Sequence, residues 1–67
     1  MALILDGWGE ICTHVEIASG ITRSMRTIIR WSLLPTDPLP VRKAPDGHGV
    51  VAAADEVEAW CRRRGLA

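Results

Sequence analysis

Apolar positions along the chain recur with the period of a helix in three stretches, and two short segments before the last of these are predicted as strands. The first stripe has i, i+3, i+4, i+7 spacing and consists of Trp8, Ile11, Cys12 and Val15. Asp6 precedes this stripe and is a favourable N-cap residue, while Gly20 follows it as a typical helix stop. The pattern therefore predicts a first helix over residues 7–18.

A second helix is predicted over residues 24–33. Its apolar stripe consists of Met25, Ile28 and Ile29. The side away from Ile28 would carry Arg23, Arg26 and Arg30, at i, i+3 and i+7. Either Thr22 or Ser24 can cap the start of this helix, and Pro35 ends it because a helix seldom continues into a proline.

The middle of the chain predicts a connector followed by a small hairpin. Residues 35–40 contain three prolines and are expected to be rigid and extended. A short strand at 41–44 and a return strand at 50–52 flank a segment rich in turn residues. Asp46-Gly47 within that segment is a strong hairpin signal, since both residues tolerate a positive φ.

The last helix begins at Asp55 or at the alanines before it, and Gly65 stops it. Its inner stripe consists of Val57, Trp60 and Cys61, with Arg64 left open as a further member. The three tryptophans each lie on an apolar stripe and are expected in the core: Trp8, Trp31 and Trp60. The sequence thus predicts one mainly α domain over 1–67 with a small β-hairpin, in the order α-α-β-β-α.

Charge is distributed unevenly although the formal net charge is zero. Residues 1–20 hold three carboxylates and no Lys or Arg, whereas residues 21–50 hold five cationic side chains and two carboxylates. Residues 51–67 hold three of each sign. The positive charge is therefore concentrated in the middle of the chain, and local potential matters more than the total.

Little in the sequence supports a metal site, a cofactor or catalysis. Cys12 and Cys61 are interpreted as buried thiols, and with His14 and His48 they lack the paired spacing of a zinc site. No Ser, His and Asp combination or phosphate-binding loop is evident, so we expect a protein that is not an enzyme. No apolar run approaches membrane-spanning length, and the apolar start lacks a basic leader, so a cytoplasmic location is expected.

Four segments in order resemble one known family: Gly7–Ile11, Ser24–Trp31, Leu39–Arg42 and Asp55–Trp60. The chain resembles the excisionase-type, MerR-like winged helix-turn-helix proteins of phages, prophages and bacterial regulators. Within Ser24–Trp31 the resemblance lies in a serine cap followed by an Arg-Thr pair and an Arg-Trp pair. It implies a second helix in the DNA major groove and a hairpin wing near the minor groove or backbone.

The candidate DNA-contacting residues follow from this resemblance and from the charge pattern. Arg26 and Arg30 are candidates for guanine or phosphate contact, with a solvated helix face as the alternative. Arg23 is expected at phosphate, and Ser24 and Thr27 at phosphate or base edges, with a simple capping role left open for Ser24. The hairpin candidates are Arg42, Lys43 and His48, the last at the wing tip.

Two functions remain open at this level. The first is sequence-specific binding of double-stranded DNA, as an excisionase-like accessory factor, a transcription regulator or the DNA-recognition piece of a packaging assembly. We expect a monomer, with cooperative binding to repeated sites left open. The second is a protein interaction module that docks a recombinase such as an integrase, a polymerase or a packaging partner through an acidic surface of Asp6, Glu10 and Glu16.

Overall fold

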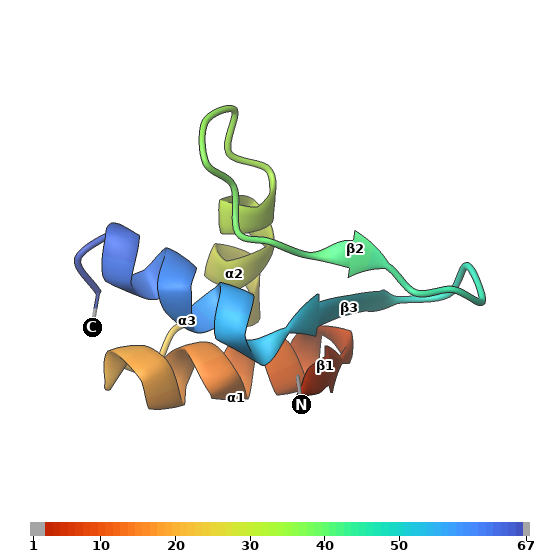
Figure 1. The fold of residues 1–67 in the computed structure, drawn as a ribbon, viewed down its shortest axis with the longest axis horizontal. Coiled ribbons are helices and arrows are strands. Elements are labelled where there is room, and N and C mark those ends of the chain that lie inside the picture. Colours follow the sequence, from red (N-terminus) through yellow and green to blue (C-terminus); the bar gives the residue numbers. More distant parts are fainter. Residues whose placement is uncertain (1–2, 67) are drawn as a thin grey trace.

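The computed structural model describes residues 3–66 and contains three helices and three strands (Figure 1). In chain order these are β1 (Ile4–Asp6), α1 (Gly7–Ser19), α2 (Met25–Ser32), β2 (Arg42–Lys43), β3 (Val50–Ala53) and α3 (Ala54–Arg63). The strands form one antiparallel sheet in the order β1-β3-β2. The five expected elements thus occur in the expected order, and an additional strand precedes them.

The helix ends follow local sequence signals, with one exception. Gly20 adopts a left-handed backbone with φ 75°, and its N–H donates to the carbonyl of Glu16 at 2.8 Å. Asp6 occupies the N-cap position of α1, but its carboxylate accepts no capping hydrogen bond within residues 3–66. Instead the backbone N–H of Asp6 donates to Glu10 Oε1 at 3.1 Å, so the glutamate stabilises the first turn.

Strand β1 was not predicted from the sequence. Its central residue Leu5 is buried and pairs with Ala52 of β3, while Ile4 and Asp6 on either side are exposed. Three residues are too few for an alternating pattern to be recognised, and the pairing partner lies far along the chain. Strand β1 therefore contributes Leu5 to the core through a contact that only tertiary structure supplies.

The core lies between the sheet, α1, α2 and α3. Its buried members are Leu5, Ile11, Val15, Ile28, Leu39, Ala52, Ala54, Val57, Trp60 and Cys61. Trp60 is 1% exposed, and Trp31 packs against it with ring centroids 5.4 Å apart. Trp8 and Trp31 are only half-buried at the margin of the core, so the expectation of three core tryptophans holds fully for Trp60 alone.

The two cysteines are both free thiols but differ in environment. Cys61 is fully buried, and burial raises the pKa of its thiol above the ordinary value. Cys12 is half-buried rather than buried, and its thiol donates a hydrogen bond to the backbone carbonyl of Arg23 at 3.2 Å. This bond ties α1 to the segment that precedes α2.

The proline-rich connector between α2 and β2 reverses direction rather than running extended, as the loop at the top of Figure 1 shows. The N–H of Leu39 donates to the carbonyl of Trp31 at 3.0 Å, and the Leu39 side chain is buried. Asp37 has a positive φ of 48°, a conformation that Asp tolerates better than most residues. The expected extended connector is therefore wrong, because Leu39 enters the core.

Candidate nucleic-acid interface

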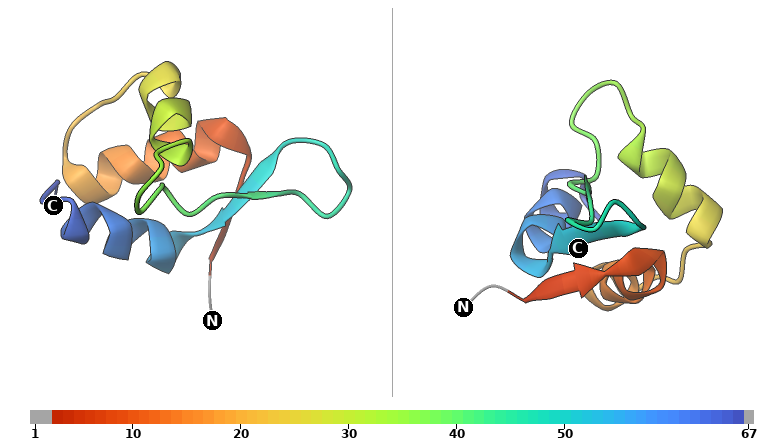
Figure 2. Two further views of the ribbon diagram at one scale, coloured as in Figure 1. Left: turned by 90° about the horizontal axis from the view of Figure 1, so that it is seen from above. Right: turned by 90° about the vertical axis from the view of Figure 1, so that its right-hand side faces the viewer.

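Most of the candidate residues lie on two exposed elements, helix α2 and the β2–β3 hairpin. Helices α1 and α3 lie side by side, α2 stands above α1, and the β2–β3 hairpin extends away from the helices (Figures 1 and 2). α2 and the hairpin point in different directions in Figure 1. The candidates on these two elements are therefore separate groups, linked through the connector.

Helix α2 presents Arg26 and Arg30 to solvent. The two residues are four positions apart, so they share one face, while Ile28 on the other side is completely buried. Neither arginine forms an ion pair with a carboxylate in the part of the chain that the structure describes. The sequence of α2 contains no acidic residue. This face is therefore a compact positive surface with free guanidinium groups.

Arg23 does not belong to this face, contrary to the sequence prediction. It lies before Ser24, the N-cap of α2, and its guanidinium carbon is 5.5 Å from the centroid of the Trp31 ring. The side chain is half-buried, and its Nε has no hydrogen-bond partner among the described residues. The physical reason is that the helix begins only at Met25, so helical spacing does not govern the direction of Arg23.

Ser24 and Thr27 form the start of α2. The Ser24 hydroxyl accepts a hydrogen bond from the backbone N–H of Thr27 at 3.2 Å, and the two hydroxyl oxygens are 3.0 Å apart. Of the two caps considered, the structure uses Ser24, whose backbone is extended as capping requires. The capping role of Ser24 is thus shown, and both hydroxyls lie at the positive end of the α2 dipole.

The hairpin carries Arg42 and Lys43 on β2, opposite Val51 and Val50 of β3. Both side chains are exposed. A guanidinium nitrogen of Arg42 lies 3.9 Å from Glu56 Oε2, a long and solvated contact that leaves the cation available. Because successive side chains of a strand alternate, the two cations point to opposite faces of the hairpin.

His48 lies exposed at the hairpin tip. Its backbone N–H donates to Asp46 Oδ1 at 2.9 Å, which closes a tight turn. Gly47 and Gly49 on either side adopt φ of 82° and 79°, values that glycine accepts without strain. A turn is found where Asp46-Gly47 predicted one, although only the glycine of this pair has a positive φ, and it leaves His48 at the outer end of the hairpin.

The sequence did not predict a set of hydrogen bonds that holds Asp37 of the connector in place. The guanidinium of Arg63 donates to both carboxylate oxygens of Asp37, at 2.9 and 3.3 Å, and Trp60 Nε1–H donates to the Asp37 carbonyl at 2.8 Å. The Arg63 hydrogen bond holds the pKa of Asp37 below its ordinary value. Nothing in the sequence links residues so far apart, yet these bonds fix the path from α2 to the hairpin.

Neither a metal centre nor a membrane span is found in residues 3–66. No group of three or more His, Cys, Asp or Glu side chains in this range is placed to hold a metal ion. None of the helices there is both long and apolar enough to cross a membrane. Comparison of the chain with protein-family models, with curated proteins and with solved structures gave no match.

Proposed function

We propose that this protein binds double-stranded DNA in a sequence-specific manner as a small, non-enzymatic winged helix-turn-helix domain. In this proposal α2 is the recognition helix and the β2–β3 hairpin is the wing. The protein acts in the cytoplasm as an excisionase-like accessory factor or a transcription regulator of phage or prophage type. The resemblance of its helix and hairpin segments to that family is one support, and the charged surfaces are the other.

The observation that carries the proposal is the arrangement of α2. Ile28 holds one side of the helix in the core, and Arg26 and Arg30 face solvent without a carboxylate partner in the described range. An eight-residue helix is about 12 Å long, a length that the major groove accommodates. An arginine at such a position can donate two parallel hydrogen bonds to guanine.

The remaining candidates would position the domain on the DNA backbone. Lys43 and Arg42 on the hairpin reach phosphates, and His48 at its tip approaches the minor groove. Ser24 and Thr27 offer hydroxyls to the phosphate nearest the start of α2. Arg23, which stacks on Trp31, is the weakest of the proposed phosphate contacts, because leaving the ring would cost its packing.

A binding measurement with designed variants tests this proposal. A duplex enriched from a random-sequence library by the wild-type protein serves as the probe, and affinity is measured by fluorescence anisotropy. We expect Arg26→Ala and Arg30→Ala each to weaken binding by about 1–3 kcal/mol, roughly 5- to 150-fold, and to relax the preference at the contacted base. Lys43→Ala should weaken binding to all duplexes alike. It should also reduce the slope of log affinity against log salt concentration by about 1.

Arg62→Ala is the matched control. Arg62 is an exposed arginine of α3 and belongs to neither α2 nor the hairpin, so its loss should leave the affinity nearly unchanged. The zero net charge predicts a modest affinity for random DNA. If no duplex is enriched at low salt, or if Arg62→Ala weakens binding as much as Arg26→Ala, the proposal is wrong.

A further inference from the structure

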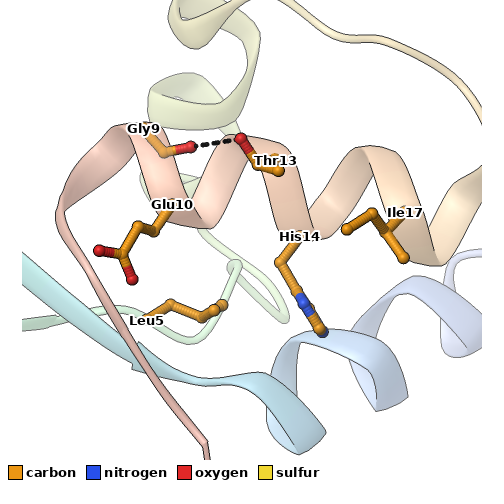
Figure 3. Close-up of a pocket in the computed structure, with 6 residues that line it drawn as sticks. All are labelled: Leu5, Gly9, Glu10, Thr13, His14 and Ile17. Carbon is orange, nitrogen blue, oxygen red and sulfur yellow. Dashed lines mark hydrogen bonds between the residues drawn. The ribbon is translucent and has the colours of Figure 1, made fainter.

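An open groove runs along α1. One stripe of the helix forms its wall, and Leu5 of β1 contributes its side chain beside this wall (Figure 3). The groove has a volume of about 280 Å³ and is lined by Leu5, Gly9, Glu10, Thr13, His14 and Ile17. Four of these residues have the spacing i, i+3, i+4 and i+7, which places them on one side of α1.

The groove offers apolar surface that the fold leaves open. Ile17 is 72% exposed at the rim, whereas the Leu5 side chain that lines the groove is only 5% exposed and belongs to the core. Gly9 lies in open space at the groove, since a Cβ built at this position would meet no atom within 4 Å. A single exposed isoleucine is common on protein surfaces, but here it borders an open hollow of about 280 Å³.

The rim of the groove is anionic. Glu10 lines it directly, and Glu58 of α3 stands next to it, 2.8 Å from His14 Nε2 and 44% exposed. No Lys or Arg occurs in the first 22 residues, and within residues 3–66 no Lys or Arg forms an ion pair with Glu10 or Glu58. A ligand that carries positive charge would therefore find carboxylates not yet neutralised by arginine or lysine.

The groove faces away from the proposed DNA surface. Cys12, whose thiol reaches the segment before α2, is two residues beyond Glu10 and so points to nearly the opposite side of the helix. The groove and the exposed face of α2 can thus be occupied at the same time. A partner in the groove would not compete with DNA for the arginines.

We propose that this groove binds a peptide segment of a partner protein in which a leucine- or isoleucine-sized side chain is flanked by Lys or Arg. The apolar side chain packs against the exposed Ile17, and the flanking cations meet Glu10 and Glu58. Shape and charge thus specify the same ligand, since an acidic or purely polar segment would match only part of the groove. This binding is independent of the DNA-binding function.

Titration of the isotope-labelled full chain with synthetic peptides, followed by NMR chemical shifts, tests the proposal. The probe is the capped peptide Gly-Arg-Lys-Leu-Leu-Lys-Arg-Gly, with one control that replaces both leucines by serine and another that replaces all cations by glutamate. We expect saturable shifts at Leu5 and along residues 9–17 with the probe. Both controls should bind at least about tenfold more weakly.

Two matched pairs of variants separate the groove from the rest of the surface. Ile17→Ser should weaken the probe about tenfold, whereas Leu33→Ser, at a residue 75% exposed and outside the groove, should not. Glu10→Gln keeps an acceptor for the Asp6 N–H and should weaken the probe about two- to fivefold, whereas Glu16→Gln should not. Arg26→Ala should leave peptide binding unchanged, so a failure of DNA binding would not affect this result.

Three outcomes would overturn the proposal. The first is the absence of saturable shifts at millimolar probe, and the second is equal binding of the serine control, which would indicate charge attraction alone. The third is movement of the groove resonances when the protein alone is diluted. That result would make a second copy of the chain the occupant of the groove.

Discussion

Leu39 anchors the connector between α2 and the hairpin, and its truncation is the most informative test of the fold. Its side chain is 1% exposed although it is flanked by two prolines, and its N–H donates to the Trp31 carbonyl. The Leu39→Ala variant removes the core contact and leaves the backbone bond. The change therefore isolates the contribution of side-chain burial in a segment without regular secondary structure.

The expected loss is large for a chain of this size. Truncation of a buried leucine to alanine costs about 3 kcal/mol, from lost transfer free energy and from the cavity that remains. A domain of 67 residues is stable by roughly 3–10 kcal/mol in total. Leu39→Ala should therefore remove between a third and all of the free energy of unfolding, and lower Tm by about 15 °C.

Urea unfolding followed by tryptophan fluorescence and far-ultraviolet circular dichroism measures this loss. With a slope near 1 kcal/mol per molar urea, the midpoint should fall by about 3 M. Leu33→Ala is the control, because it deletes the same atoms from a side chain that is 75% exposed, and its effect should stay within about 0.5 kcal/mol. Equal destabilisation by the two variants would refute the assignment of Leu39 to the core.

Two further predictions concern a helix cap and an ion pair between distant residues. Ser24→Ala should lower the free energy of unfolding by about 1 kcal/mol in the same urea assay, because the Thr27 N–H loses its acceptor, and Ser24→Asp should restore most of it. Asp37→Asn should lower Tm at neutral pH but not in acid. Because Arg63 holds the pKa of Asp37 below its ordinary value of 3.8, the contribution of this carboxylate is present above that pH and is lost as the pH falls through the lower, folded-state pKa. A Tm difference between wild type and Asp37→Asn that stayed constant down to the most acid pH would contradict this reasoning.

Much of the local structure could be predicted, because local signals specify it. The apolar stripes and the glycines at positions 20 and 65 predicted the helices to within one or two residues, and Asp46-Gly47 predicted the turn. The exposure of Arg26 and Arg30 also followed from helical spacing. These features depend on contacts between residues a few positions apart, so the sequence contains all the information they need.

The features that escaped prediction share a different physical origin. β1 exists because Leu5 pairs with Ala52, and Asp37 is held in place by Arg63. Each of these contacts joins residues more than 20 positions apart. Arg23 packs against Trp31 because the helix begins at Met25, one residue after the predicted start, and Arg23 therefore lies outside it.

The amino-acid sequence by itself determined the helices, the hairpin turn and the concentration of positive charge in the middle of the chain, because periodicity, capping and charge are local properties. Helical spacing also predicted the exposure of Arg26 and Arg30, but only the tertiary structure decided the surroundings of the other side chains. In the folded chain Arg23 packs against Trp31, Leu39 is buried and Ile17 lies beside an open groove. Burial depends on which distant segments pack together, because this packing removes apolar surface from water.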